Sequence, residues 1–123
     1  IQFPRIDDRI QGRRYRKVFA NGTARPTAGR IDGFDQIAAI DVETGHRDGF
    51  SFGEGAYCSE PVFVPEGPGE GEGWLLALVW DSQKNASFLA VLDARKVAAG
   101  PVARVHMPAR VPGGFHCHWR SAA

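Results

Sequence analysis

The sequence has few cysteines, little net charge and no long hydrophobic run, and each shortage argues against a class of protein. Cys58 and Cys117 are the only two cysteines, which is too few for a disulfide scaffold and favours a cytoplasmic chain with free thiols. The longest apolar run, residues 74–80, is far shorter than the roughly 20 residues of a membrane-spanning helix. A net charge of +1 argues against a nucleic-acid partner held by electrostatics.

The abundant glycines and prolines, and the short apolar runs between them, indicate β-structure. The 15 glycines and 8 prolines fall between short runs of β-branched and aromatic residues, which is typical of an all-β protein with many turns. Asp41, Asp81 and Asp93 each close an apolar run, where a carboxylate can accept hydrogen bonds from the turn that follows. Seven strands are predicted, at residues 14–20, 36–41, 47–52, 60–64, 74–80, 88–92 and 102–107.

The last four predicted strands are expected to form an antiparallel four-stranded meander, preceded by a less regular one. Repeated four-stranded meanders are the blades of a β-propeller, although seven strands could also make a small closed barrel or a sandwich. Two blades need neighbours to bury their faces, and the sequence begins with Ile1 rather than with methionine. We therefore expect this chain to be the C-terminal part of a longer protein.

Two charged segments are interpreted as structural. The basic run at residues 13–17 follows Asp7 and Asp8 closely, and we interpret it as a solvated edge strand rather than as a phosphate-binding patch. Residues 65–73, PEGPGEGEG, are interpreted as a disordered or exposed excursion that is too acidic and glycine-rich to pack. The spacing of its glutamates matches no calcium-binding loop.

Four histidines are candidates for metal chemistry. His46 follows a turn and is expected to face solvent, and His106 is interpreted as a structural or surface residue on a strand. His116 and His118 are two residues apart, so on a strand both would face the same side and could bind zinc, copper or iron. The residues alone leave a second interpretation open, in which both are simply exposed near a fraying chain end.

Glu60 is the candidate carboxylate. It precedes Pro61 and the apolar run at residues 62–64, and a carboxylate at the start of a buried strand is costly unless it is paired. Glu60 is therefore either a strand-edge residue in water or a buried group that accepts a hydrogen bond from the imidazole of a metal-binding histidine.

Taken together, four segments resemble the C-terminal region of the carotenoid cleavage oxygenase family, which includes carotenoid, apocarotenoid and lignostilbene dioxygenases. The segments are FPRID at residues 3–7, GRRYRKVF at 12–19, EPVFVP at 60–65 and GFHCHW at 114–119. The resemblance runs, with gaps, from Ile1 to about Trp119, and it implies a seven-bladed β-propeller. Residues 1–56 would then belong to the penultimate blade, and residues 57–119 to the last blade and an iron-ligand tail.

The resemblance also implies a metal site. The family holds one Fe(II) with four histidines, and His116 matches the last of them, whereas His118 matches no ligand. Glu60 matches a glutamate that orients an iron-bound imidazole through its Nδ1–H. Gln2 stands where the family often has another such glutamate, and its missing charge puts iron affinity or redox tuning in doubt. Cys117 stands where the family has glycine, so its side chain would either crowd the metal axis or point away from it, and a thiol near Fe(II) would be open to oxidation.

The activity that the resemblance implies is oxidative cleavage. O2 would split a C=C double bond of a lipophilic or aromatic alkene, such as a carotenoid, apocarotenoid or stilbene, into two carbonyl products. The isolated chain, with one of four ligands, is expected to be inactive without the remainder of the propeller. Peripheral membrane contact would suit lipophilic substrates, although the sequence shows no basic amphipathic helix. The alternatives are a truncated non-catalytic β-module, or a small barrel that binds zinc through His116, Cys117 and His118.

Overall fold

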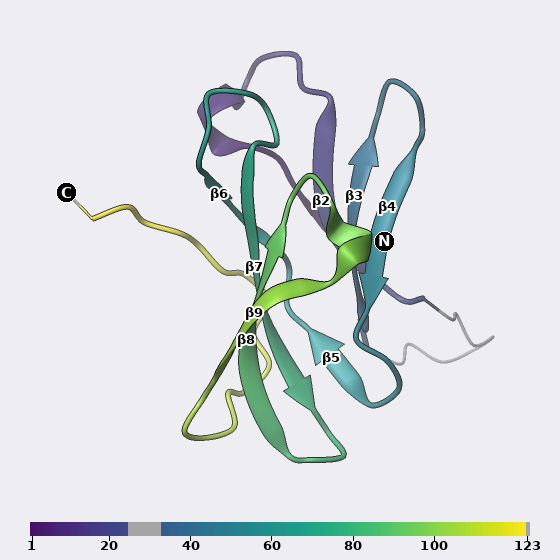
Figure 1. Ribbon diagram of the computed structural model, residues 1–123, viewed down its shortest axis with the longest axis vertical. Coiled ribbons are helices and arrows are strands. Elements are labelled where there is room, and N and C mark those ends of the chain that lie inside the picture. The colour runs from purple at the N-terminus through teal and green to yellow at the C-terminus, as the bar shows by residue number, and fades with distance from the viewer. Residues whose placement is uncertain (25–32, 123) are drawn as a thin grey trace.

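A computed structural model describes residues 1–24 and 33–122, and within these the chain is built from strands and two short 3₁₀-helices (Figure 1). The strands are β1 Gln2–Arg5, β2 Lys17–Gly22, β3 Gln36–Asp41, β4 Arg47–Ser51, β5 Ala56–Cys58, β6 Val62–Pro65, β7 Gly73–Asp81, β8 Ala86–Asp93 and β9 Pro101–His106. The 3₁₀-helices are η1 Asp8–Ile10 and η2 Val97–Ala99. The all-β prediction is confirmed.

The first sheet has four antiparallel strands in the order β1-β2-β3-β4. The β3–β4 hairpin turns at Asp41, whose carboxylate accepts hydrogen bonds from the backbone N–H groups of Glu43 and Thr44 at 3.1 and 3.2 Å. This is the predicted turn chemistry, in which a short polar side chain satisfies the backbone of the turn. The sheet is the less regular meander that the sequence predicts, with β1 as an additional edge strand.

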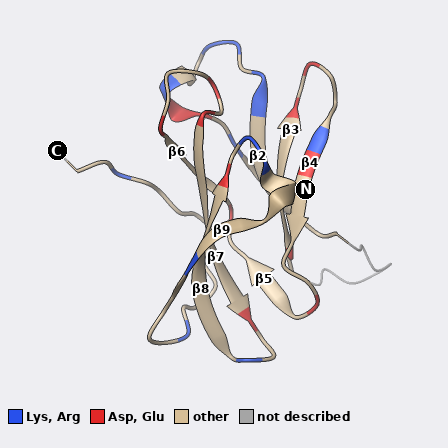
Figure 2. Ribbon diagram, viewed as in Figure 1, with Lys and Arg blue, Asp and Glu red and all other residues tan. Residues whose placement is uncertain are grey.

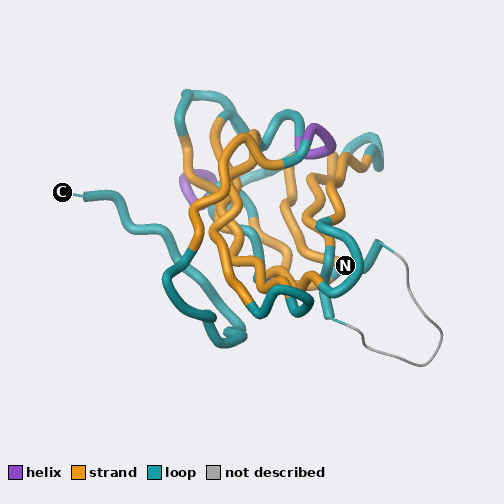
Figure 3. Tube along the Cα trace, turned by 60° about the horizontal axis from the view of Figure 1, so that its bottom comes forward, coloured by secondary structure: helices purple, strands orange, loops and turns teal. Residues whose placement is uncertain are grey.

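The second sheet contains the predicted meander β6-β7-β8-β9, and it adds β5 on the same edge of β7 as β6. Asp81 and Asp93 again accept hydrogen bonds from the backbone of the turns that follow them. Both sheets are open antiparallel layers, so the closed-barrel alternative is not what the described residues form (Figures 1 and 3). None of the helices in the described part of the chain is long and apolar enough to cross a membrane.

The core lies between the two sheets. The Phe19 ring from β2 stacks on the Phe63 ring from β6, with centroids 5.2 Å apart, and Phe19 is fully buried. Gly100 sits at φ +81°, and a Cβ there would lie only 2.7 Å from the Phe50 ring, so glycine allows the chain leaving η2 to pass close over β4. Charged residues are concentrated toward loops and strand ends, which leaves most of the strand centres without charged side chains (Figure 2).

Truncation of Phe19 to alanine should strongly destabilise this packing. Removing a fully buried aromatic ring typically costs about 3–5 kcal/mol, because transfer free energy is lost and a cavity remains. We expect chemical denaturation of the complete protein to show that loss for Phe19→Ala. The half-exposed Tyr15 supplies the matched control, and Tyr15→Ala should change the free energy of unfolding by less than about 1 kcal/mol. Equal effects of the two variants would contradict this account of the core.

Two interpretations of charged segments are wrong. The basic run does not form an edge strand, because β2 begins only at Lys17 and lies between β1 and β3. The glycine-rich loop is not an unpacked excursion, because the Glu70 carboxylate accepts the backbone N–H groups of Arg16 and Lys17 at 2.6 and 2.7 Å. The glycine-rich loop therefore packs against the start of β2, and the negative charge of Glu70 lies beside the basic run.

Candidate metal-ligand site

A β-bulge aims Glu60 toward the C-terminal tail. Cys58 pairs with Val79 and Val62 pairs with Leu76, so three residues of the β5–β6 edge face two residues of β7. The extra residue falls at the Ser-Glu-Pro segment, where proline lacks the N–H that a regular ladder needs. The Ser59 hydroxyl replaces part of that ladder, because it accepts the backbone N–H of Leu78 at 3.0 Å. A bulge characteristically redirects a side chain. Here the extra residue interrupts the regular alternation of the edge, and the Glu60 side chain faces the C-terminal tail.

The Glu60 carboxylate is nearly inaccessible and is surrounded by donors. Its side chain is 2% exposed, so the charge must be compensated by partners. Oε1 accepts the backbone N–H of Cys117 at 2.7 Å and lies 3.5 Å from Nη1 of Arg5. Oε2 lies 3.3 Å from Nδ1 of His116. The structure thus brings together Glu60 and His116, the two residues that the motifs singled out separately.

The geometry fixes which imidazole nitrogen faces outward. An ionised carboxylate can only accept hydrogen bonds, so in a neutral His116 the proton lies on Nδ1 and the lone pair lies on Nε2. The Phe3 ring packs edge-on against the imidazole, with centroids 5.7 Å apart and planes at 87°. The His116 side chain remains 73% exposed in this chain. Within the described part of the chain nothing hydrogen-bonds to Nε2, so His116 presents one imidazole nitrogen to a metal, as a ligand requires.

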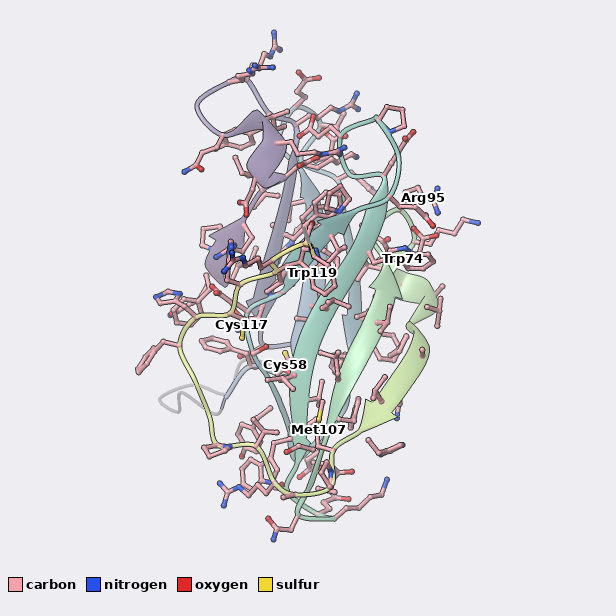
Figure 4. The ribbon with its side chains drawn as sticks, turned by 90° about the vertical axis from the view of Figure 1, so that its left-hand side faces the viewer. Cys58, Trp74, Arg95, Met107, Cys117 and Trp119 are labelled. Atoms are coloured by element: carbon pink, nitrogen blue, oxygen red, sulfur yellow. The ribbon has the colours of Figure 1, made fainter. Side chains whose placement is uncertain are left out.

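The tail that carries His116 is tied to the second sheet at several points, although it forms no strand (Figures 3 and 4). The backbone N–H of Met107 donates to the Ser87 carbonyl at 2.9 Å, and that of Val111 donates to the Ser87 hydroxyl at 3.0 Å. The Arg110 guanidinium lies 4.3 Å from the Trp80 ring centroid, in cation–π contact. These contacts, together with Glu60, hold an otherwise irregular segment in place.

A groove of about 310 Å³ lies beside the imidazole. Tyr57 and Trp80 stack on one another along it, with centroids 5.2 Å apart, and Arg110 covers the Trp80 ring. Cys58 and Cys117 also line the groove, and Figure 4 shows both near the path of the tail. The groove combines aromatic faces with the candidate ligand.

The other sequence candidates are not part of this cluster. Gln2 is exposed on the edge strand β1, opposite Asn21, and no hydrogen bond joins it to His116 among residues 1–24 and 33–122. His118 is exposed, as are His46 and His106. Within the described part of the chain, no three His, Cys, Asp or Glu side chains are grouped so that they could hold a metal ion. A proposed ligand set must therefore draw on residues outside this cluster.

Sequence reasoning assigned no role to Arg5 and Phe3, which both contact the cluster. They lie two residues apart on β1, where the pairing with β2 is irregular between Gln2 and Arg5. Arg5 reaches the carboxylate and Phe3 reaches the imidazole. The one sequence feature that could have pointed to these two residues is the FPRID motif, which contains both of them.

Cys58 and Cys117 differ in their surroundings. Cys58 is buried in the core, and burial raises the pKa of its thiol to about 12, with the Asp35 charge adding to the effect. Because the thiolate is the reactive form, we expect Cys58 in the folded complete protein to resist alkylation by iodoacetamide at pH 8. Mass spectrometry should detect its modification only after denaturation. Rapid labelling of Cys58 in the native state would show that the β5 edge opens.

Comparisons with known proteins show the family to which the chain belongs. A family model described as "Retinal pigment epithelial membrane protein" matches residues 1–121. The chain is 36% identical to carotenoid 9,10(9′,10′)-cleavage dioxygenase 1 of Pisum sativum, over 94% of this chain and 24% of the relative. The crystal structure of Pseudomonas brassicacearum lignostilbene dioxygenase matches with a TM-score of 0.89 and 31% identity, over 98% of this chain and 27% of that one.

A second solved structure that resembles this chain is of a metal-substituted protein. Cobalt-substituted apocarotenoid oxygenase of Synechocystis matches with a TM-score of 0.85 and 29% identity. The match covers 95% of this chain and 24% of that one. This chain therefore spans about a quarter of the length of the relatives it matches.

Proposed function

Because the chain belongs to the carotenoid cleavage oxygenase family, we propose that it forms part of a non-haem iron(II) dioxygenase. The complete protein would cleave a C=C double bond of a carotenoid, apocarotenoid or stilbene-type substrate. The observation that carries the proposal is the 3.3 Å contact between Nδ1 of His116 and the buried carboxylate of Glu60. That contact leaves Nε2 free, in a chain whose relatives are named as cleavage dioxygenases.

The residues present fit an iron ligand. A metal-binding histidine commonly donates its second ring N–H to a carboxylate, and His116 has such a partner in Glu60. His116 would hold the iron through Nε2, and the three further histidines that the resemblance implies would come from the rest of the complete protein. When bound, Fe(II) supplies open positions at which O2 can be activated beside the alkene.

The chain's own residues would bind and orient. Glu60 holds the His116 ring in one tautomer and one orientation, and Cys117 is fixed through its backbone N–H. In the overall reaction each alkene carbon gains one oxygen atom from O2, so one C=C bond becomes two C=O bonds with no further oxidant.

We also propose a cytoplasmic location and contact with lipophilic substrate at a membrane surface, without a nucleic-acid partner.

An isotope experiment tests the reaction. The complete protein, reconstituted with Fe(II), would be incubated under ¹⁸O₂ with β-carotene, an apocarotenal and a hydroxystilbene in separate assays. We expect one of these classes to yield two carbonyl fragments, each with one ¹⁸O atom after correction for exchange with water. Absence of cleavage in all three classes by an iron-loaded protein would refute the proposal and favour a non-catalytic β-module.

A further inference from the structure

Arg5 is a basic side chain that reaches the Glu60 carboxylate of the candidate metal-ligand site. Its Nη1 lies 3.5 Å from Oε1 of Glu60, and its side chain is 23% exposed. On its other side Nη2 lies 3.8 Å from the exposed carboxylate of Asp8. Among the described residues, no other Lys or Arg forms an ion pair with Glu60. Arg5 is therefore placed to compensate a carboxylate that water scarcely reaches.

The two oxygens of Glu60 have different partners. Oε1 faces Arg5 and the backbone N–H of Cys117, whereas Oε2 faces Nδ1 of His116. A carboxylate with one oxygen fixed by two donors cannot turn freely about its terminal torsion. Oε2 is consequently held on the side of the imidazole, and the direction of the Nδ1–H bond is set by contacts on the opposite oxygen.

The strand that carries Arg5 is also constrained at Phe3. Phe3 has φ +49°, a left-handed backbone conformation that is uncommon for a bulky residue and is maintained only where the surroundings determine it. Its ring contacts Phe34 at 5.9 Å and the His116 imidazole at 5.7 Å, both edge-on. The short strand β1 thus contacts the site at two points. Phe3 packs against the His116 imidazole, and Arg5 reaches the Glu60 carboxylate.

We propose that Arg5 is a positioning residue for His116, and that it acts through Glu60. The guanidinium fixes Oε1, Glu60 presents Oε2 to Nδ1, and the imidazole keeps Nε2 directed away from the carboxylate. The metal-related part of this inference rests on the proposed iron site, whereas the orientation of the ring does not require a metal. The rival explanation is that Arg5 contributes only to folding stability.

The first measurement is made on the metal-free complete protein. Histidine ¹⁵N spectra, assigned with His116→Ala, report which ring nitrogen of His116 carries the proton. We expect Arg5→Met to reduce the Nδ1-protonated population, Arg5→Lys to restore it in part, and Arg13→Met to leave it unchanged. Arg13 is a matched control because it is exposed and lies outside the cluster. Unchanged His116 signals in Arg5→Met would overturn the proposal.

The second measurement is the rate at which a ferrous chelator removes iron from the loaded protein. Residues that support a metal ligand change metal affinity by about 10–100-fold, and for Arg5, one contact further away, we expect roughly three- to tenfold faster loss in Arg5→Met. Equal acceleration in Arg5→Met and Arg5→Lys, with an equally lowered Tm of the metal-free proteins, would establish the purely structural role. If His116→Ala lost iron no faster than wild type, the iron site would be refuted, and the ¹⁵N spectra would still decide the role of Arg5.

Discussion

Replacing His116 with alanine in the complete protein is expected to abolish stoichiometric iron binding and, with it, cleavage of the substrate double bond. Among residues 1–24 and 33–122, His116 supplies the one imidazole with a buried carboxylate behind Nδ1 and no hydrogen bond at Nε2. Even loss of a supporting residue around a metal costs about 10–100-fold in affinity, and loss of a direct ligand should cost more. Iron per protein molecule and the rate of carbonyl formation measure the two effects.

His118→Ala is the matched control. His118 is also an exposed histidine on the tail, only two residues away, and the cluster does not include it. We expect this variant to retain iron and cleavage. Loss of metal in His118→Ala as well as in His116→Ala would instead support the zinc-site alternative, in which both histidines and Cys117 bind the metal.

Much of the fold follows from local chemistry that the sequence displays. Asp41, Asp81 and Asp93 close strands because their carboxylates satisfy turn backbone groups, and this placed the main hairpins correctly. The strands that sequence reasoning missed, β1 and β5, have four and three residues, and β1 contains Pro4. Such short segments have no readable alternation and depend on pairing with a longer neighbour.

The candidate site was only partly predictable. The motifs singled out Glu60 and His116, but the contact between them spans 56 residues of sequence and forms only when the tail folds back along the second sheet. The extra residue of the β5–β6 edge was not predicted, because register emerges from the pairing of two strands and not from either alone. The contact of Arg5 with Glu60 depends on the same folding and was missed for the same reason.

Glu60→Ala should have the second largest effect, on stability as well as on iron. The substitution removes the acceptor for the Cys117 N–H and for His116 Nδ1, and it leaves Arg5 without its buried partner. Breaking a buried charge pair by removing one partner typically costs about 3–5 kcal/mol, and the lower end of that range applies here because Arg5 is 23% exposed and also faces Asp8. We expect thermal and chemical denaturation of the metal-free complete protein to show that loss, and iron to dissociate readily from the variant.

Glu60→Gln separates the charge of the side chain from its shape. Glutamine keeps one acceptor oxygen and nearly the same volume, so it can still accept the Cys117 N–H or the His116 Nδ1–H, but not both with one oxygen in the present arrangement. We expect it to fold with a smaller loss of stability than alanine, while its iron affinity falls by roughly 10–100-fold. The exposed Glu54 offers a control, since Glu54→Gln removes the same charge at a distance from the cluster. Wild-type iron retention in Glu60→Gln would show that the carboxylate acts only as an anchor for the tail, because the hydrogen bond to the Cys117 backbone would then be sufficient to keep His116 in place.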